Sequence, residues 1–168
     1  WWNQDVNDTL SIGGRLYFTS SDFSLRDKSR AYILAFNKEM IKQNNLDDPF
    51  TLVRENKWTI DKFNDMASHV SNDLNGDGNI DDKDQFGVGT DSYNAFVTFV
   101  YGCGVSAIGK DEKNTPIPTL NSDRTVSVIE KVRSFFTLND VTVIPDQWVG
   151  KVDYDFWAIS SKGFKEGR

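Results

Sequence analysis

Oxygen-bearing side chains recur at alternate positions between Asp73 and Asp84, in the stretch DLNGDGNIDDKD. Hard cations such as Ca²⁺ take six to eight oxygen ligands, and a 12-residue loop supplies them from positions 1, 3, 5, 7, 9 and 12. Gly78 falls at position 6, where the chain has to turn sharply and a Cβ would obstruct it. The stretch therefore predicts a calcium loop. Its expected ligands are Asp73, Asn75, Asp77, Asn79 (through its backbone carbonyl), Asp81 and Asp84.

The last position of this loop departs from the usual pattern, because Asp84 stands where a bidentate Glu is typical. The shorter side chain reaches less far, which predicts weak affinity for calcium. No second Asp-x-Asn-x-Asp-Gly run occurs in the sequence. A single loop inside a larger domain favours a structural staple over a paired calcium sensor. The alternative interpretation is an acidic, Gly- and Asn-rich turn that binds no ion.

An acidic and an aromatic side chain, Asp91 and Tyr93, stand together at the predicted start of a helix. Sugars offer flat C–H faces that stack on aromatic rings, and hydroxyl groups that donate hydrogen bonds to carboxylates. The pair also follows a predicted strand, and ligands of open α/β sheets bind at the carboxyl ends of strands. We therefore predict that Asp91 and Tyr93 contact a carbohydrate. The alternative is that Tyr93 only begins the helix, with its ring partly buried.

The residues that most enzymes use for catalysis are scarce in this sequence. His69 is the only histidine, and it falls on the polar side of a predicted helix. Cys103 is the only cysteine, which excludes an internal disulfide and suggests a small buried apolar residue. No Gly-x-Ser-x-Gly turn, phosphate-binding Gly-rich loop or Cys-x-x-Cys pair occurs. The sequence thus favours a non-enzymatic protein. A carbohydrate-active enzyme, the alternative, would need two carboxylates across one cleft.

Composition narrows the class of protein further. The chain has 168 residues, enough for one domain with a sizeable core, and a net charge of −6. Its scattered basic residues argue against a nucleic-acid partner, and no apolar run approaches the ~20 residues of a membrane span. A disulfide-free chain with a weak calcium loop fits a bacterial cell surface. Because the sequence starts at Trp1 without a signal peptide, we expect one domain of a longer protein.

Hydrophobic periodicity and capping residues predict alternating strands and helices, which indicates an α/β fold. Thr59 is the expected N-cap of one helix, with Trp58 packed on Phe63. Trp148 and Trp157 fit either the core or a cleft. The expected strands are 14–19, a central strand over 31–36, 85–89, and a hairpin of 105–109 with 115–119. The expected helices are 38–44, one opening at 60, 93–101, 122–136 and 154–165.

Several segments together resemble a known family. They are residues 11–18 (SIGGRLYF), 36–38 (FNK), 45–50 (NLDDPF), 55–63 (ENKWTIDKF), 84–87 (DQFG) and 164–168 (FKEGR). This succession is similar to that in the second lobe of family 1, carbohydrate-type extracellular solute-binding proteins of bacterial ABC importers. The resemblance implies that residues 1–168 form one type II periplasmic-binding-protein-like lobe, with a mixed sheet flanked by helices.

The resemblance also implies a function. Proteins of this family bind a sugar or oligosaccharide between two lobes, deliver it to ABC transporter permease subunits, and catalyse no reaction. An acidic and an aromatic residue at the start of the helix after the central strand contact sugar there, and these correspond to Asp91 and Tyr93. The protein would be extracellular, and would meet the membrane only through a lipid anchor upstream of this chain. The runner-up function is a calcium-dependent surface interaction module of the dockerin kind.

Overall fold

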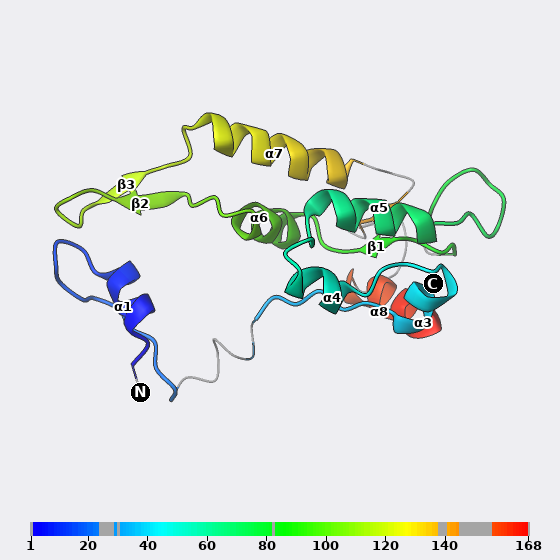
Figure 1. The fold of residues 1–168 in the computed structure, drawn as a ribbon, viewed down its shortest axis with the longest axis horizontal. Coiled ribbons are helices and arrows are strands. Elements are labelled where there is room, and N and C mark those ends of the chain that lie inside the picture. The colour runs from blue at the N-terminus through cyan, green and yellow to red at the C-terminus, as the bar shows by residue number, and fades with distance from the viewer. Residues whose placement is uncertain are drawn as a thin grey trace.

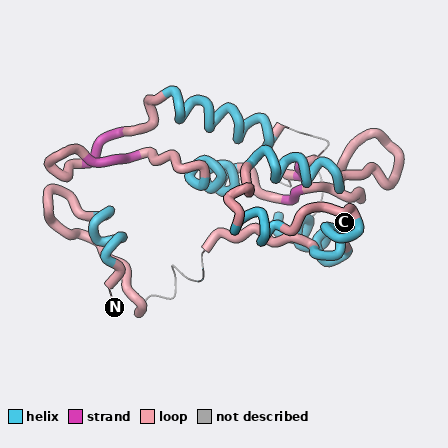
Figure 2. Tube along the Cα trace, viewed as in Figure 1, coloured by secondary structure: helices cyan, strands magenta, loops and turns pink. Residues whose placement is uncertain are grey.

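The computed structural model describes residues 2–23, 29, 31–81, 83–137, 141–144 and 156–167, with the side chains of 156–160 left undescribed. The fold is mixed α/β and mostly helical (Figures 1 and 2). The described helices are α1 (Gln4–Leu10), α3 (Lys38–Gln43), α4 (Pro49–Arg54), α5 (Ile60–Val70), α6 (Tyr93–Gly102), α7 (Asp123–Phe136) and α8 (Phe156–Glu166). The described strands are β1 (Val88–Gly89), β2 (Ile108–Lys110), β3 (Pro116–Pro118) and β4 (Thr142–Val143).

The strands form two separate two-stranded sheets. Strand β1 pairs in parallel with β4, so that Val88 lies opposite Thr142. Strands β2 and β3 form the predicted antiparallel hairpin, with Gly109 opposite Ile117. Figure 1 shows this hairpin and α1 at the opposite end of the molecule from α3 and α8.

Side-chain caps begin several helices, and Thr59 is the N-cap that the sequence predicts. Asn37 accepts hydrogen bonds from the N–H groups of residues 39 and 40, and Thr59 accepts one from that of Lys62. The ring centroids of Trp58 and Phe63 are 5.7 Å apart, which confirms the hydrophobic staple at the start of α5. Ser122 caps α7 in the same way. Helix α8 confirms the predicted last helix.

The core lies between α5, α6, α7 and strand β1. Its main cluster of buried residues consists of Phe63, Ala67, Val88, Phe135 and Val141, and a second one of Val100, Val105 and Val132. Rings of Phe99 and Phe136 pack against Phe135 at centroid distances of 5.4 Å. Such contacts between aromatic rings add to the stabilisation that area burial provides. The core therefore packs α5, α6 and α7 together with β1.

Two predicted strands are wrong. Residues 31–37 carry no strand, and Ile33 is 84% exposed. A continuous apolar run indicates burial, but it does not identify the partner, and the described ladder of β1 goes to β4 instead. Residues 14–19 also form no strand, because Gly13 and Gly14 adopt positive φ and turn the chain back from Ile12 to Arg15. Two small sheets thus stand where the sequence predicts one mixed sheet.

In the part of the chain that the structure describes, no helix has both the length and the apolar character that crossing a membrane requires.

Candidate functional site

A groove of about 810 Å³ opens beside the carboxyl end of β1. One wall is the extended segment 32–34, and the other comes from the start of α5 and from α6. Aromatic side chains contribute to it, among them Tyr32, Trp58 and Phe99. Polar groups come from three threonines, Thr59, Thr90 and Thr98. The groove therefore combines apolar faces with hydrogen-bonding groups, as ligand sites commonly do.

Asp91 lines this groove, as its predicted role requires. Its Oδ1 accepts a hydrogen bond from the N–H of Ala95 (2.9 Å), and its Oδ2 accepts one from Nδ2 of Asn94 (3.3 Å). The carboxylate thus also caps the first turn of α6, which fixes its position. Each oxygen keeps a second lone pair with which it can accept a bond from a ligand.

Tyr93 does not line the groove and is 75% exposed. The residues near or in α6 that do line it are 91, 95, 98, 99 and 102, which follow the helical repeat. Tyr93 lies off that stripe. The structure therefore brings Asp91 to the groove without Tyr93, whose contact with a sugar stays a prediction.

Among the groove residues that the sequence did not predict as ligand contacts are Trp58 and Lys131. The sequence assigned Trp58 only to the staple, and in the structure it also lines the groove. Lys131 of α7 also lines the groove, and its Nζ lies 2.6 Å from Oδ2 of Asp61 in α5. This ion pair joins residues that are distant in sequence, so no local pattern could identify it.

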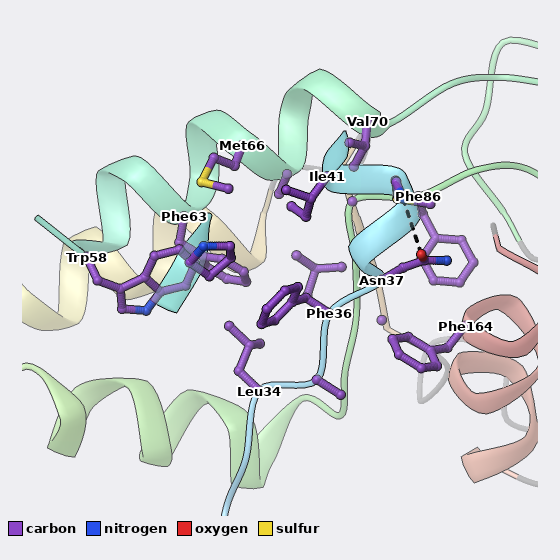
Figure 3. A pocket seen from close by; sticks show the side chains of 17 residues that line it. Leu34, Phe36, Asn37, Ile41, Trp58, Phe63, Met66, Val70, Phe86 and Phe164 are labelled. Carbon is purple, nitrogen blue, oxygen red and sulfur yellow. Dashed lines mark hydrogen bonds between the residues drawn. The ribbon is translucent and has the colours of Figure 1, made fainter. Parts of the chain in front are cut away.

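A smaller pocket of about 160 Å³ adjoins the same extended segment (Figure 3). Leu34 and Phe36 line it together with Phe63, Phe86 and other apolar residues, as the figure shows. The side chain of Asn37 also lines it, but its oxygen caps α3. This pocket therefore offers a ligand mainly apolar surface, which does not suit a sugar.

The acidic loop 73–84 is held together by its own side chains. Asp84 is completely buried. Its Oδ1 accepts from the N–H groups of Leu74 (2.9 Å) and Asn75 (3.3 Å), and its Oδ2 accepts from that of Asp81 (2.9 Å). The two ends of the loop are thereby joined through one carboxylate.

The first half of the loop uses the same kind of bond. Asp73 accepts from the N–H groups of Gly76 (2.7 Å) and Gly78 (2.8 Å), and Asp77 accepts from that of Asn79 (2.9 Å). Gly78 has a φ of 82°, which confirms the sharp turn expected at position 6. This half of the loop is therefore a series of turns in which Asp side chains accept hydrogen bonds from backbone N–H groups a few residues further on.

These hydrogen bonds lower the pKa values of two carboxyl groups in the loop. Burial raises the pKa of Asp84, but the backbone N–H groups of Asp81, Leu74 and Asn75 outweigh it and lower that pKa below 3.8. The pKa of Asp77 is also lowered, chiefly by the N–H of Asn79. Both side chains are therefore ionised at neutral pH.

The predicted calcium ligands lie in one loop, and their oxygen chemistry suits a hard cation. Within the described residues, however, no three or more His, Cys, Asp or Glu side chains are grouped so as to hold a metal ion. The carboxylates of Asp73, Asp77 and Asp84 bind loop N–H groups instead. Calcium binding stays a prediction that rests on the spacing of the donors.

The remaining candidates for chemistry have ordinary surroundings. His69 is exposed on α5, and its Nδ1 lies 2.7 Å from the carbonyl oxygen of Asp65. Cys103 is partly buried beside the groove and packs against the cluster around Val132. Trp148 lies outside the described residues, as does the side chain of Trp157.

Comparisons with protein-family models, with curated proteins and with solved structures gave no match to this chain.

Proposed function

We propose that this chain is one lobe of an extracellular carbohydrate-binding protein that delivers its ligand to a bacterial ABC importer. The observation that supports this most is the groove of about 810 Å³ beside the carboxyl end of β1, with Asp91 at the start of α6. Ligands of open α/β sheets bind at that end of the strands. A sugar or oligosaccharide is the proposed ligand, and the proposed role is binding without catalysis.

The chemistry of the groove suits such a ligand. Trp58 and Tyr32 offer aromatic faces for sugar C–H groups, and Asp91 accepts hydrogen bonds from hydroxyl groups. A second lobe would close over the groove by a hinge motion and exclude water. Permease subunits would then receive the ligand at the cell surface, where a lipid anchor upstream of this chain would hold the protein.

Titration calorimetry of the chain with a panel of oligosaccharides tests this proposal. We expect weak binding, because a single lobe lacks the opposing contacts. Asp91→Asn keeps the cap of α6 but removes the charge. A hydrogen bond to a charged group contributes roughly 1.5–3 kcal/mol, so the variant should bind about ten- to a hundredfold more weakly. Tyr93→Ala measures whether Tyr93 contacts the sugar at all.

Asp5→Asn is the matched control, because it removes the same charge from α1, outside the groove. It should leave binding unchanged. If no oligosaccharide binds the parent chain, or if Asp91→Asn binds as tightly as the parent, this groove is not the sugar site.

We further propose that loop 73–84 binds one Ca²⁺ as a structural staple. Asp73, Asn75, Asp77, Asn79, Asp81 and Asp84 would hold it, and the ion would neutralise part of their charge. The dissociation constant expected for extracellular modules is about 10⁻⁴ to 10⁻³ M. A ligand at a hundredfold excess over its dissociation constant stabilises the folded state by about 2.7 kcal/mol.

Thermal melts in millimolar calcium and in chelator measure this linkage. The midpoint should be higher with calcium, and Asp77→Ala should abolish the difference. Magnesium at the same concentration controls for ionic strength. Equal midpoints for the parent chain in calcium and chelator would leave the loop as a turn without an ion.

The second candidate function is a calcium-dependent interaction module of the dockerin kind, and the loop itself is what favours it. Such a module would bind a protein partner only in calcium, and would ignore oligosaccharides. A carbohydrate-active enzyme is less favoured, because Asp91 is the only carboxylate among the described residues that line the groove. Released sugar product would support the enzyme, and calcium-dependent protein binding would support the module.

A further inference from the structure

The charged groups of the groove are few and of opposite sign. Among the described residues that line it, only Asp91 and Lys131 carry a full charge. They come from different elements, since Asp91 precedes α6 and Lys131 belongs to α7. Any charge preference of the groove therefore depends on these two side chains.

The two side chains differ in what they can still offer a ligand. Both oxygens of Asp91 already accept a hydrogen bond from the first turn of α6. A lysine Nζ carries three N–H donors, and the structure uses one of them on Asp61 at 2.6 Å. The Lys131 side chain is 49% exposed, so its ammonium group is accessible to a ligand.

Asp61 does not line the groove, although it pairs with the lysine that does. It lies in the first turn of α5 and accepts a hydrogen bond from the ammonium group of Lys131. The pair is exposed, so the lysine can exchange Asp61 for another carboxylate or contact both at little cost. Asp61 is therefore a competitor for any anion that binds Lys131.

We propose that the groove prefers an acidic oligosaccharide, with a uronate carboxylate bound to Lys131 and neutral sugar hydroxyls placed against Asp91. This inference rests on the proposed sugar-binding function and names its ligand class. Lys131 is the residue that determines the preference, and Asp61 limits its strength. A ligand with carboxylates on every unit fits less well, because one of them would face Asp91.

The size of the preference follows from the exposure of Lys131 and from the net charge of the chain. Exposed ion pairs are weak, so the uronate should improve binding by roughly three- to fivefold. The chain as a whole carries −6 and repels anions at a distance. The preference therefore comes from the local contact between the uronate and Lys131, and it should shrink when salt screens exposed charges.

Calorimetry with matched ligand pairs tests the inference on the full chain. One pair is xylotetraose with and without a glucuronate substituent, and the other is galactobiose with galactosyl-galacturonate. The parent chain should bind the acidic member of at least one pair three- to fivefold more tightly, less so in 0.5 M NaCl. Lys131→Met should remove that preference, so that the acidic and the neutral member of the pair bind equally tightly. Asp61→Asn should increase it, because the competing carboxylate is gone.

Lys131→Arg is the conservative control, since it keeps the charge and should keep most of the preference. Thermal midpoints of all variants show whether each one is folded. A parent chain that binds neutral and acidic members equally overturns this inference but leaves the proposed function intact, and so does a Lys131→Met variant that keeps the preference. A parent chain that binds neither member of either pair, nor any other oligosaccharide, overturns both.

Discussion

Replacing Asp84 by Asn measures how much the buried carboxylate stabilises the fold without a metal. The new amide oxygen can still accept from Leu74 and Asn75, but at neutral rather than charge-assisted strength. The new NH₂ group instead meets the N–H of Asp81. Both groups are donors, so the N–H of Asp81 loses its acceptor. One charge-assisted hydrogen bond is lost, worth about 1.5–3 kcal/mol.

Weakening of the other two bonds brings the expected loss to about 2–4 kcal/mol. That is a large part of the 5–15 kcal/mol typical of a domain. With a urea m-value of about 1–3 kcal/mol/M, the unfolding midpoint should fall by roughly 1 M or more. Urea titrations followed by tryptophan fluorescence, in chelator, give this value directly.

The control for this experiment is Asp77→Asn. It changes the net charge equally, and its amide oxygen can still accept the N–H of Asn79 in an exposed part of the loop. We expect its urea midpoint to stay close to that of the parent, because substitutions at exposed positions usually change stability little. If Asp84→Asn unfolds at the same urea concentration as the parent in chelator, the carboxylate does not hold the loop closed.

Gly87→Ala should destabilise the protein by at least about 1–3 kcal/mol, because the new Cβ would lie 2.2 Å from the carbonyl oxygen of Ala67. The control is Gly102→Ala at the end of α6, where the new Cβ would meet no atom within 4 Å, so its urea midpoint should equal or exceed that of the parent. Equal midpoints for the two variants would contradict the close approach of Gly87 to the backbone of Ala67. Acid should also destabilise the fold, because folding lowers the pKa values of Asp84 and Asp77. Their ionised carboxylates stabilise the folded state above about pH 4, and this stabilisation is lost as the pH falls through the pKa values of the folded state. Urea midpoints at pH 6 and pH 3 measure the loss, which should be smaller in Asp84→Asn.

Local features of the fold could be predicted from the sequence. Thr59, Asn37 and Ser122 cap their helices because a cap needs only a side-chain oxygen and the next few N–H groups. The turn at Gly78 follows from the same short-range reasoning. The hairpin of β2 and β3 is also local, because its two strands are joined by a short connection.

Features that depend on distant partners could not be predicted. The apolar run 31–36 has the composition of a strand, but pairing depends on what lies beside it, and β1 bonds with β4. The contact between Lys131 and Asp61 depends on how α5 and α7 pack. Asp91 lines the groove because it directly follows β1, whereas Tyr93 lies two residues further on, off the stripe of α6 that lines it.

The pairing of β1 with β4 has a consequence for the order of folding. Val88 and Thr142 are brought together across α6, the hairpin and α7, so a long segment must close before the first ladder bond forms. Closure of such a segment costs entropy before any contact compensates for it. Helices α5, α6 and α7 can form and dock earlier, through their own caps and phenylalanine contacts. The carboxyl end of β1, and the groove beside it, would then be among the last parts of the molecule to take shape.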